Sequence, residues 1–161
     1  MTRPPAEIEA VLADLAATPG RLAALSVGLT EAQLCFKPAG EPWSASDVLA
    51  HLRACAEVWG KSIGAMLQQP HPTLRYVSPR AWMRKSDYAA LAFSVSLPAF
   101  ARQRDELWQL LRALPIPDWS RGATFTAVTQ GREQTVLSYA QRIAQHEREH
   151  LEQIETLLKV C

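Results

Sequence analysis

The spacing of apolar residues constrains the fold of this chain more than any other feature. Four long segments repeat apolar residues at intervals of three and four, which is the pattern of an amphipathic helix rather than of a strand. These segments cover residues 5–17, 44–68, 96–114 and 135–158. Four such helices in a chain of 161 residues predict an all-α protein, a four-helix bundle formed by one domain over residues 1–161.

Polar residues just before the apolar runs predict where helices begin. Ser44 fits an N-cap, and Asp47 three residues later resembles a capping box. Thr135 fits the cap of the last helix, and Thr30 the cap of a short helical turn. Just after the first segment, Thr18-Pro19-Gly20 predicts an interruption followed by a short second helix, because proline is tolerated best in a first turn.

Two stretches between the helices carry weaker signals. Residues 73–91 show no clear period, and we expect them to cross the end of the bundle. Residues 119–133 form a polar connection with two glycines, in which a short hairpin over residues 125–129 is one interpretation. Neither stretch changes the predicted helical class.

Composition excludes several functions and indicates a compartment. The chain has 17 basic and 16 acidic residues, a balance without the positive patch that nucleic acids or anionic membranes attract. No run approaches the roughly 20 apolar residues of a membrane span, and the N-terminal residues do not resemble a secretory signal. The three cysteines are widely spaced, which fits a reducing compartment. We therefore expect a cytoplasmic protein without nucleic-acid or membrane partners.

Three histidines carry the chemistry that the sequence suggests. His146 and His150 are four residues apart, so one helical turn places both imidazoles on the same side. His51 lies on the inward side of the second helix, and it meets them if the two helices face each other. Three imidazoles bind zinc or nickel with open coordination positions, where a bound water or thiol loses its proton near neutral pH. The predicted metal ligands are thus His51, His146 and His150.

Other residues leave alternatives open at this point. The histidines could instead be hydrogen-bonded core residues. Cys55, one turn after His51, is either a fourth ligand or a small apolar side chain. A metal-bound imidazole needs an acceptor at its other nitrogen, and the available acids are Glu57, Glu147 and Glu149. The sequence does not choose among the three.

Some motifs and residues receive ordinary interpretations. Residues 146–150 also read as H-E-x-x-H, the zinc-protease motif, but the third ligand that such proteases need downstream is missing. His71 is expected to be a surface residue, and Arg121 a solvated arginine rather than a contact for an anionic substrate. The tryptophans at positions 43, 59 and 108 are expected to pack in the core or, for Trp43, against Val48 beside the cap.

Two segments resemble the DinB-like superfamily. One is Glu41-Pro42-Trp43-Ser44-Ala45-Ser46-Asp47-Val48-Leu49-Ala50-His51-Leu52, and the other is His146-Glu147-Arg148-Glu149-His150-Leu151-Glu152-Gln153-Ile154. The resemblance implies an up-down-down-up bundle, frequent homodimers, and a zinc or nickel ion on His51, His146 and His150. It also implies a low-molecular-weight thiol as a second cofactor, since similar proteins include mycothiol- and bacillithiol-dependent transferases and the N-terminal domain of mycothiol-dependent maleylpyruvate isomerase.

Three functions follow from these observations. The leading hypothesis is a metal-dependent enzyme that transfers a thiol such as bacillithiol to small electrophiles in detoxification or stress. A second is a metal-dependent hydrolase that uses a metal-bound hydroxide on a small-molecule substrate. The third is a non-catalytic bundle that the metal stabilises. The residues alone do not decide between enzyme and binding protein.

Overall fold

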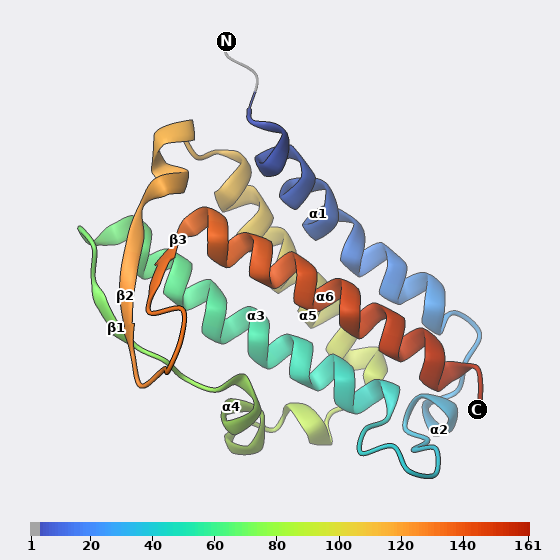
Figure 1. Cartoon of the computed structure of the whole chain (residues 1–161). Helices are drawn as coiled ribbons and strands as arrows, with labels where there is room; N and C mark the ends of the chain where they lie inside the picture. Colours follow the sequence, from blue (N-terminus) through green and yellow to red (C-terminus); the bar gives the residue numbers. More distant parts are fainter. Residues whose placement is uncertain (1–3) are drawn as a thin grey trace.

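The computed structural model describes residues 4–161 and consists of four long helices with short elements between them (Figure 1). The long helices are α1 (Ala6–Ser26), α3 (Ala45–Gln68), α5 (Phe93–Arg112) and α6 (Val136–Leu158). The short helices are α2 (Glu31–Leu34), α4 (Pro79–Lys85) and the 3₁₀ turns η1 (Tyr88–Ala90) and η2 (Ile116–Ser120). The strands are β1 (Thr73–Arg75), β2 (Gly122–Thr126) and β3 (Glu133–Thr135). The predicted four-helix bundle is confirmed, and the structure adds three short strands to the predicted all-α class.

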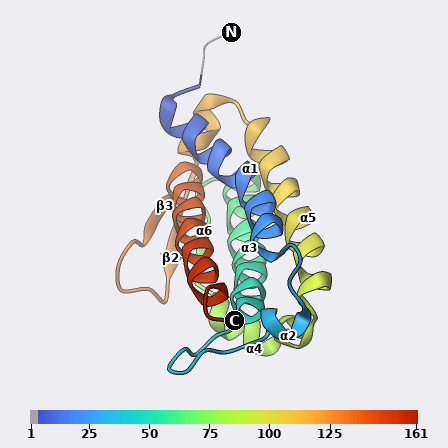
Figure 2. The same cartoon turned by 90° about the vertical axis from the view of Figure 1, so that its right-hand side faces the viewer.

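The four long helices pack side by side as a bundle. Helix α1 packs against α5 and α6, and α3 also packs against α5 and α6. Figure 1 shows α1 and α6 running in one direction and α3 and α5 in the other. Figure 2 shows the strands on the α6 side of the bundle, away from α5. This arrangement leaves the face between α3 and α6 next to the sheet and α4.

Capping interactions explain where several helices begin. At the start of α3 the Ser44 hydroxyl accepts a hydrogen bond from the Asp47 N–H at 3.1 Å, and the Asp47 carboxylate accepts one from the Ser44 N–H at 2.9 Å. Thr135 begins α6, and Thr30 begins α2, with reciprocal bonds of the same kind. The caps expected at these three positions are confirmed.

The first helix differs from its prediction because α1 continues through Pro19 without a break. Proline removes one backbone hydrogen bond from a helix interior. Leu15 and Leu22 on either side of Pro19 are both fully buried, so tertiary packing holds the helix together there. The predicted restart at Pro19 is therefore wrong.

A three-stranded sheet, not predicted as such, covers one side of the bundle. Its strand order is β1-β2-β3, with β1 parallel to β2 and β3 antiparallel to β2. Phe125 from β2 stacks on Tyr139 of α6 with ring centroids 5.1 Å apart, which attaches the sheet to the bundle. The expected hairpin over residues 125–129 lies within the observed one but is too short, because the paired residues are 122–124 and 133–135.

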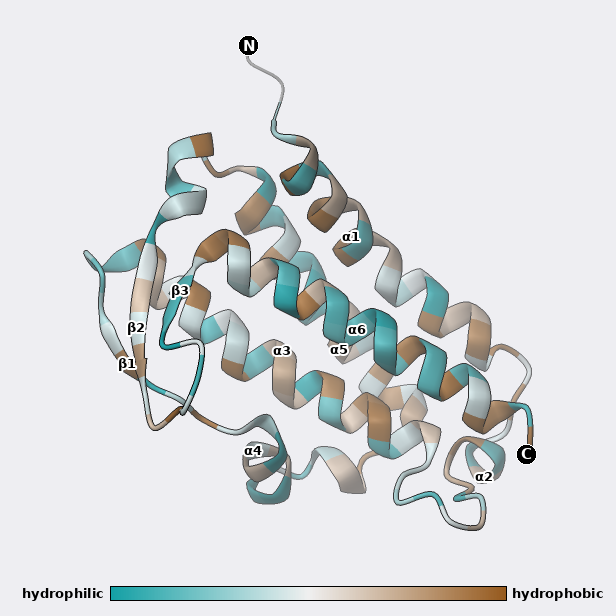
Figure 3. Cartoon of the chain, in the orientation of Figure 1, coloured by the Kyte–Doolittle hydropathy of each residue, from teal (hydrophilic) through white to brown (hydrophobic). Residues whose placement is uncertain are grey.

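The core is apolar and runs the length of the bundle. Figure 3 shows hydrophilic and hydrophobic residues alternating around the long helices, as the periodicity predicts. Fully buried side chains of α1, α3, α5 and α6 meet in it: Leu15, Leu22, Leu49, Leu52, Ile63, Phe100, Leu111, Ile143 and Leu151. Within residues 4–161, none of the helices has the length and apolar character needed to cross a membrane.

A carboxylate from α2 caps the N-terminus of α5. Helix α5 starts at Phe93, three residues before the predicted start, and its own N-cap residue forms no side-chain bond. Instead the Glu31 carboxylate accepts hydrogen bonds from the Ser94 N–H at 2.9 Å and the Phe93 N–H at 3.0 Å. These bonds, the one from Ser94 foremost, lower the pKa of Glu31 below its usual value. The cap thus joins two elements that are distant in sequence.

Replacing this cap tests its contribution to stability. We expect Glu31→Ala to lower the free energy of unfolding by about 0.5–1 kcal/mol at pH 7. The pKa of Glu31 is lower in the folded than in the unfolded protein, so the unfolded chain binds its proton first as the pH falls. The difference between wild type and variant should therefore shrink below the unfolded pKa of 4.5. Urea denaturation at pH 7 and pH 3.5 measures it, with Glu152→Ala as a control on an exposed carboxylate. An equal difference at both pH values would contradict a charged cap.

Candidate metal centre

The structure brings the three predicted histidines together between α3 and α6. His51 projects from α3, and His146 and His150 project from successive turns of α6. The Nε2 atoms of His51 and His146 are 3.3 Å apart, and those of His146 and His150 are 3.1 Å apart. His51 is 4% exposed, and the other two rings are partly buried. His146 Nε2 therefore lies close to the Nε2 atoms of both other rings.

The nitrogen positions fit one shared cation better than a set of hydrogen bonds. A neutral imidazole nitrogen either donates one proton or accepts with one lone pair, so His146 Nε2 cannot satisfy both neighbours in full. A cation accepts one lone pair from each ring. Two imidazole nitrogens bound tetrahedrally to one zinc ion at about 2.0–2.1 Å lie about 3.3 Å apart, close to the separations in this cluster. The donor set therefore suits a divalent metal.

Gln153 sets the orientation of one ring. Its side-chain oxygen Oε1 lies 2.7 Å from His150 Nδ1, and an amide oxygen only accepts, so Nδ1 carries the proton. His150 Nε2 then has its lone pair free to bind a metal. The acids expected in this role, Glu57, Glu147 and Glu149, do not contact the ring nitrogens in the described part of the chain. Gln153 is one turn from His150, so helical spacing could have identified it.

Burial keeps the histidines neutral. It is the main reason that the pKa of His51 falls to about 4 and that of His146 to about 3, and neighbouring positive groups, Arg80 among them, act in the same direction. Burial also lowers the pKa of His150. Only a neutral imidazole has a free lone pair for a metal. The three rings are therefore in the ligating form at neutral pH.

Cys55 lies beside the histidines. Its Sγ atom is 3.5 Å from His51 Nε2, and a Cys55, His51 and His146 set of ligand atoms lies within 4.8 Å of one another. Burial raises the pKa of the Cys55 thiol, so the group is neutral without a cation nearby. A bound metal would reverse this preference, because a coordinated thiol gives up its proton. Both interpretations of Cys55, ligand and apolar neighbour, remain in agreement with this position.

Two tryptophans form walls around the cluster. The Trp43 ring centroid is 5.0 Å from that of His51, and the Trp59 centroid is 4.9 Å from that of His146. Trp59 is buried as expected, and its ring N–H has no partner in the described structure. Both aromatics thus limit the access of water to the histidines.

Glu147, the acid of the H-E-x-x-H pattern, points away from the cluster. It is 2% exposed and forms an ion pair with Arg104 of α5, which is 1% exposed. A helix turns by about 100° per residue, which places Glu147 near the centre of the buried face and His146 at the edge toward α3. A charged side chain is normally exposed, so the sequence does not predict this burial of Glu147. In this position it cannot serve as the base of a zinc protease.

The remaining candidates lie elsewhere. His71 is exposed, and its Nε2 lies 3.1 Å from the Thr124 hydroxyl and 3.0 Å from a Glu133 oxygen. Arg121 donates hydrogen bonds to the backbone oxygens of Met66 and Gln69, so it caps the end of α3 instead of facing a ligand. Neither residue belongs to the histidine cluster.

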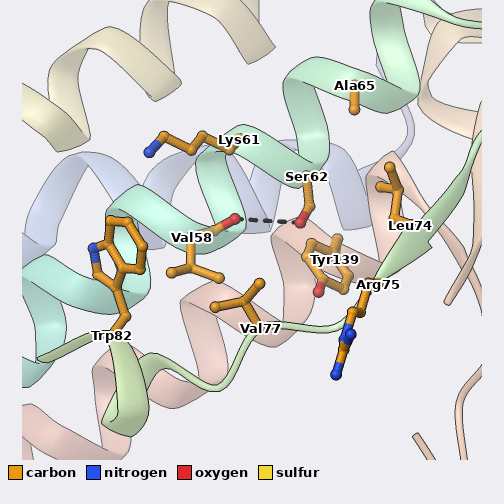
Figure 4. A pocket seen from close by; sticks show the side chains of 9 residues that line it. All are labelled: Val58, Lys61, Ser62, Ala65, Leu74, Arg75, Val77, Trp82 and Tyr139. Atoms are coloured by element: carbon orange, nitrogen blue, oxygen red, sulfur yellow. Dashed lines mark hydrogen bonds between the residues drawn. The ribbon is translucent and has the colours of Figure 1, made fainter. Parts of the chain in front are cut away.

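A hollow of about 220 Å³ lies between α3, α4 and β1 (Figure 4). None of the three histidines lines it. The side chains drawn in Figure 4 are mostly apolar, and the Ser62 hydroxyl is bound to the Val58 carbonyl at 3.2 Å. Tyr139 lines this hollow and also a second one of about 350 Å³ below the β2–β3 connection. Tyr139, whose ring contacts Trp59, therefore borders both hollows.

Comparisons with known proteins show the family and the fold. The family model of the DinB superfamily matches residues 14–154. Among solved structures, YfiT from Bacillus subtilis, described as a probable metal-dependent hydrolase with an unusual four-helix bundle topology, aligns with a TM-score of 0.82. The alignment covers 93% of this chain and 85% of YfiT at 20% sequence identity, so it establishes a shared fold. No curated protein matches the sequence.

The buried ion pair yields a stability prediction. Arg104→Met leaves the Glu147 carboxylate buried without a cation, so we expect the free energy of unfolding to fall by about 3–5 kcal/mol. The double variant Arg104→Met with Glu147→Met removes both charges and should recover most of this loss. Guanidinium denaturation of both variants and the wild type measures the coupling. A single variant within about 1 kcal/mol of wild type would contradict the pairing, and if it fails to fold, a folded double variant still supports it.

Proposed function

The chain belongs to the DinB superfamily, and from this premise we propose that it is a metal-dependent enzyme whose zinc or nickel ion is held by His51, His146 and His150. The observation that supports this most strongly is the convergence of three Nε2 atoms, at separations of 3.1 and 3.3 Å, from rings that burial keeps neutral. The hydrogen bond from His150 Nδ1 to Gln153 adds to it.

The residues around the cluster have separate tasks in this proposal. A divalent ion, when bound, lowers the pKa of a coordinated thiol or water by several units. Gln153 holds the His150 ring in the tautomer that presents Nε2. Trp43 and Trp59 exclude water from two sides, which strengthens electrostatic interactions at the site. The side that these rings leave open would admit the small-molecule substrate.

The reaction that we propose is transfer of a low-molecular-weight thiol to a small electrophile. The sulfur forms a bond to the electrophilic carbon, the thiol proton passes to solvent, and the leaving group departs with the electrons of its former bond. A thiolate attacks without a general base once its pKa is lowered. Glu147, the acid that the sequence motif offers as a base, is buried in its ion pair with Arg104. Such chemistry suits detoxification or stress defence.

Hydrolysis is the second candidate. YfiT, which shares this fold, is described as a probable metal-dependent hydrolase, and the same three histidines would serve that reaction. It differs in needing water as the nucleophile and a group to take up its proton.

The cytoplasmic location and the homodimer, which rest on the sequence resemblance and the composition, remain predictions.

Metal content tests the proposed ligands. We expect about one equivalent of zinc or nickel in the purified, untagged wild type, and less than about a tenth of that in His51→Ala, His146→Ala and His150→Ala. His71→Ala is the matched control, because His71 lies outside the cluster and should leave the metal content unchanged. Inductively coupled plasma mass spectrometry gives the stoichiometry. Absence of metal from the wild type, even after loading with each ion, would rule out this site.

Turnover distinguishes the two enzymatic candidates. With bacillithiol, mycothiol or glutathione and a chromogenic electrophile, we expect conjugation by metal-loaded protein and at least about a hundredfold loss after metal removal or in His150→Ala. Ester or amide cleavage that proceeds without thiol would favour hydrolysis instead. If metal removal lowers only the melting temperature and neither assay shows turnover, the bundle is non-catalytic.

A further inference from the structure

Arg80 lies on one side of the histidine cluster. It is the second residue of α4, and its guanidinium carbon is 5.1 Å from the centroid of the Trp43 ring. The Trp43 ring in turn lies 5.0 Å from His51 and 6.2 Å from His150. The positive charge is thus one aromatic ring away from two of the three predicted ligands.

Arg142 repeats this arrangement on another side. It precedes His146 by one turn of α6, and its guanidinium carbon lies 5.3 Å from the Trp59 ring centroid. Trp59 contacts His146 edge to face at 4.9 Å. Arg142 also lines the hollow of about 350 Å³ at the β2–β3 connection, which the histidines do not line. Two arginine–tryptophan–histidine stacks therefore approach the same cluster from α4 and from α6.

Neither arginine is engaged by the protein's own acids. Within residues 4–161, no hydrogen bond or ion pair is formed by the guanidinium of Arg80 or of Arg142. Arg148, by contrast, is paired with Asp14 at 2.9 Å. The acid nearest to His150 in sequence, Glu149, is exposed and accepts a hydrogen bond from Gln145. Two unpaired guanidinium groups, held in place by stacking, are left for an external anion.

From this geometry we propose that Arg80 and Arg142 bind an oxyanion of the substrate, a carboxylate or a phosphate, beside the three histidines. Guanidinium groups form paired, charge-assisted hydrogen bonds with such groups, and stacking on an aromatic ring holds them in place for this purpose. The inference rests on the proposed function, and it names the substrate class as anionic.

Anion binding to the intact protein tests this site. Isothermal titration calorimetry at low salt would measure the affinity of zinc-loaded protein for succinate and for inorganic phosphate. We expect Arg80→Gln and Arg142→Gln each to weaken the preferred anion by about three- to tenfold, and the double variant by at least about thirtyfold. Arg112→Gln is the matched control, since Arg112 stacks on Trp108 at 4.7 Å far from the histidines. Preference for one of the two probes identifies the substrate's anionic group.

Metal content of the same samples separates this inference from the proposed function. Variants that keep the metal but lose anion affinity support the arginine site. Variants that keep both metal and wild-type affinity overturn it, and so does metal-loaded wild type that binds neither probe. If the wild type holds no metal, the proposed function fails, and the titration of metal-free protein still decides whether these arginines bind anions. Affinity that falls equally in the Arg112 variant would also overturn the assignment.

Discussion

The ion pair between Arg104 and Glu147 fixes the rotation of α6, and the histidine cluster depends on that rotation. A buried carboxylate without a cation costs several kcal/mol, so α6 must turn Glu147 toward α5. With Glu147 at the centre of the buried face, His146 and His150 stand at its edge, where α3 presents His51. Rotating the helix by one residue would bury a different side chain and separate the rings. The position of one charge in the core thus determines where the polar site can form.

Local signals in the sequence account for what could be predicted. The caps at Ser44 and Thr135 concern residues three apart in the chain, so their geometry is readable without a fold. The same holds for the pairing of His146 with His150, which needs only a helical turn. That His51 joins them was an expectation that required α3 to face α6, and the bundle supplies this contact. Identification as metal ligands goes beyond proximity and stays a prediction.

Features that depend on residues distant in the sequence could not be predicted from it. Helix α1 continues through Pro19 because Leu15 and Leu22 on either side are buried. Helix propensity alone does not include the effect of this burial. The parallel pairing of β1 with β2 joins strands about fifty residues apart, and neither strand is long enough to show a period. The burial of Glu147 could not be predicted because its partner Arg104 is 43 residues away. In each case the deciding interaction is tertiary, so a window of a dozen residues does not contain it.

One carboxylate links the frame of the protein to the proposed anion site. Glu57 of α3 accepts hydrogen bonds from the Trp82 ring N–H at 2.8 Å and the Tyr88 hydroxyl at 2.7 Å, and so attaches α4 and η1 to the bundle. Helix α4 has only seven residues, too few to be stable alone, so these bonds determine where Arg80 stands. The histidines rest on long, well-packed helices, whereas this arginine rests on a short segment. Substitutions in α4 are therefore expected to move Arg80 with little effect on the core of the bundle.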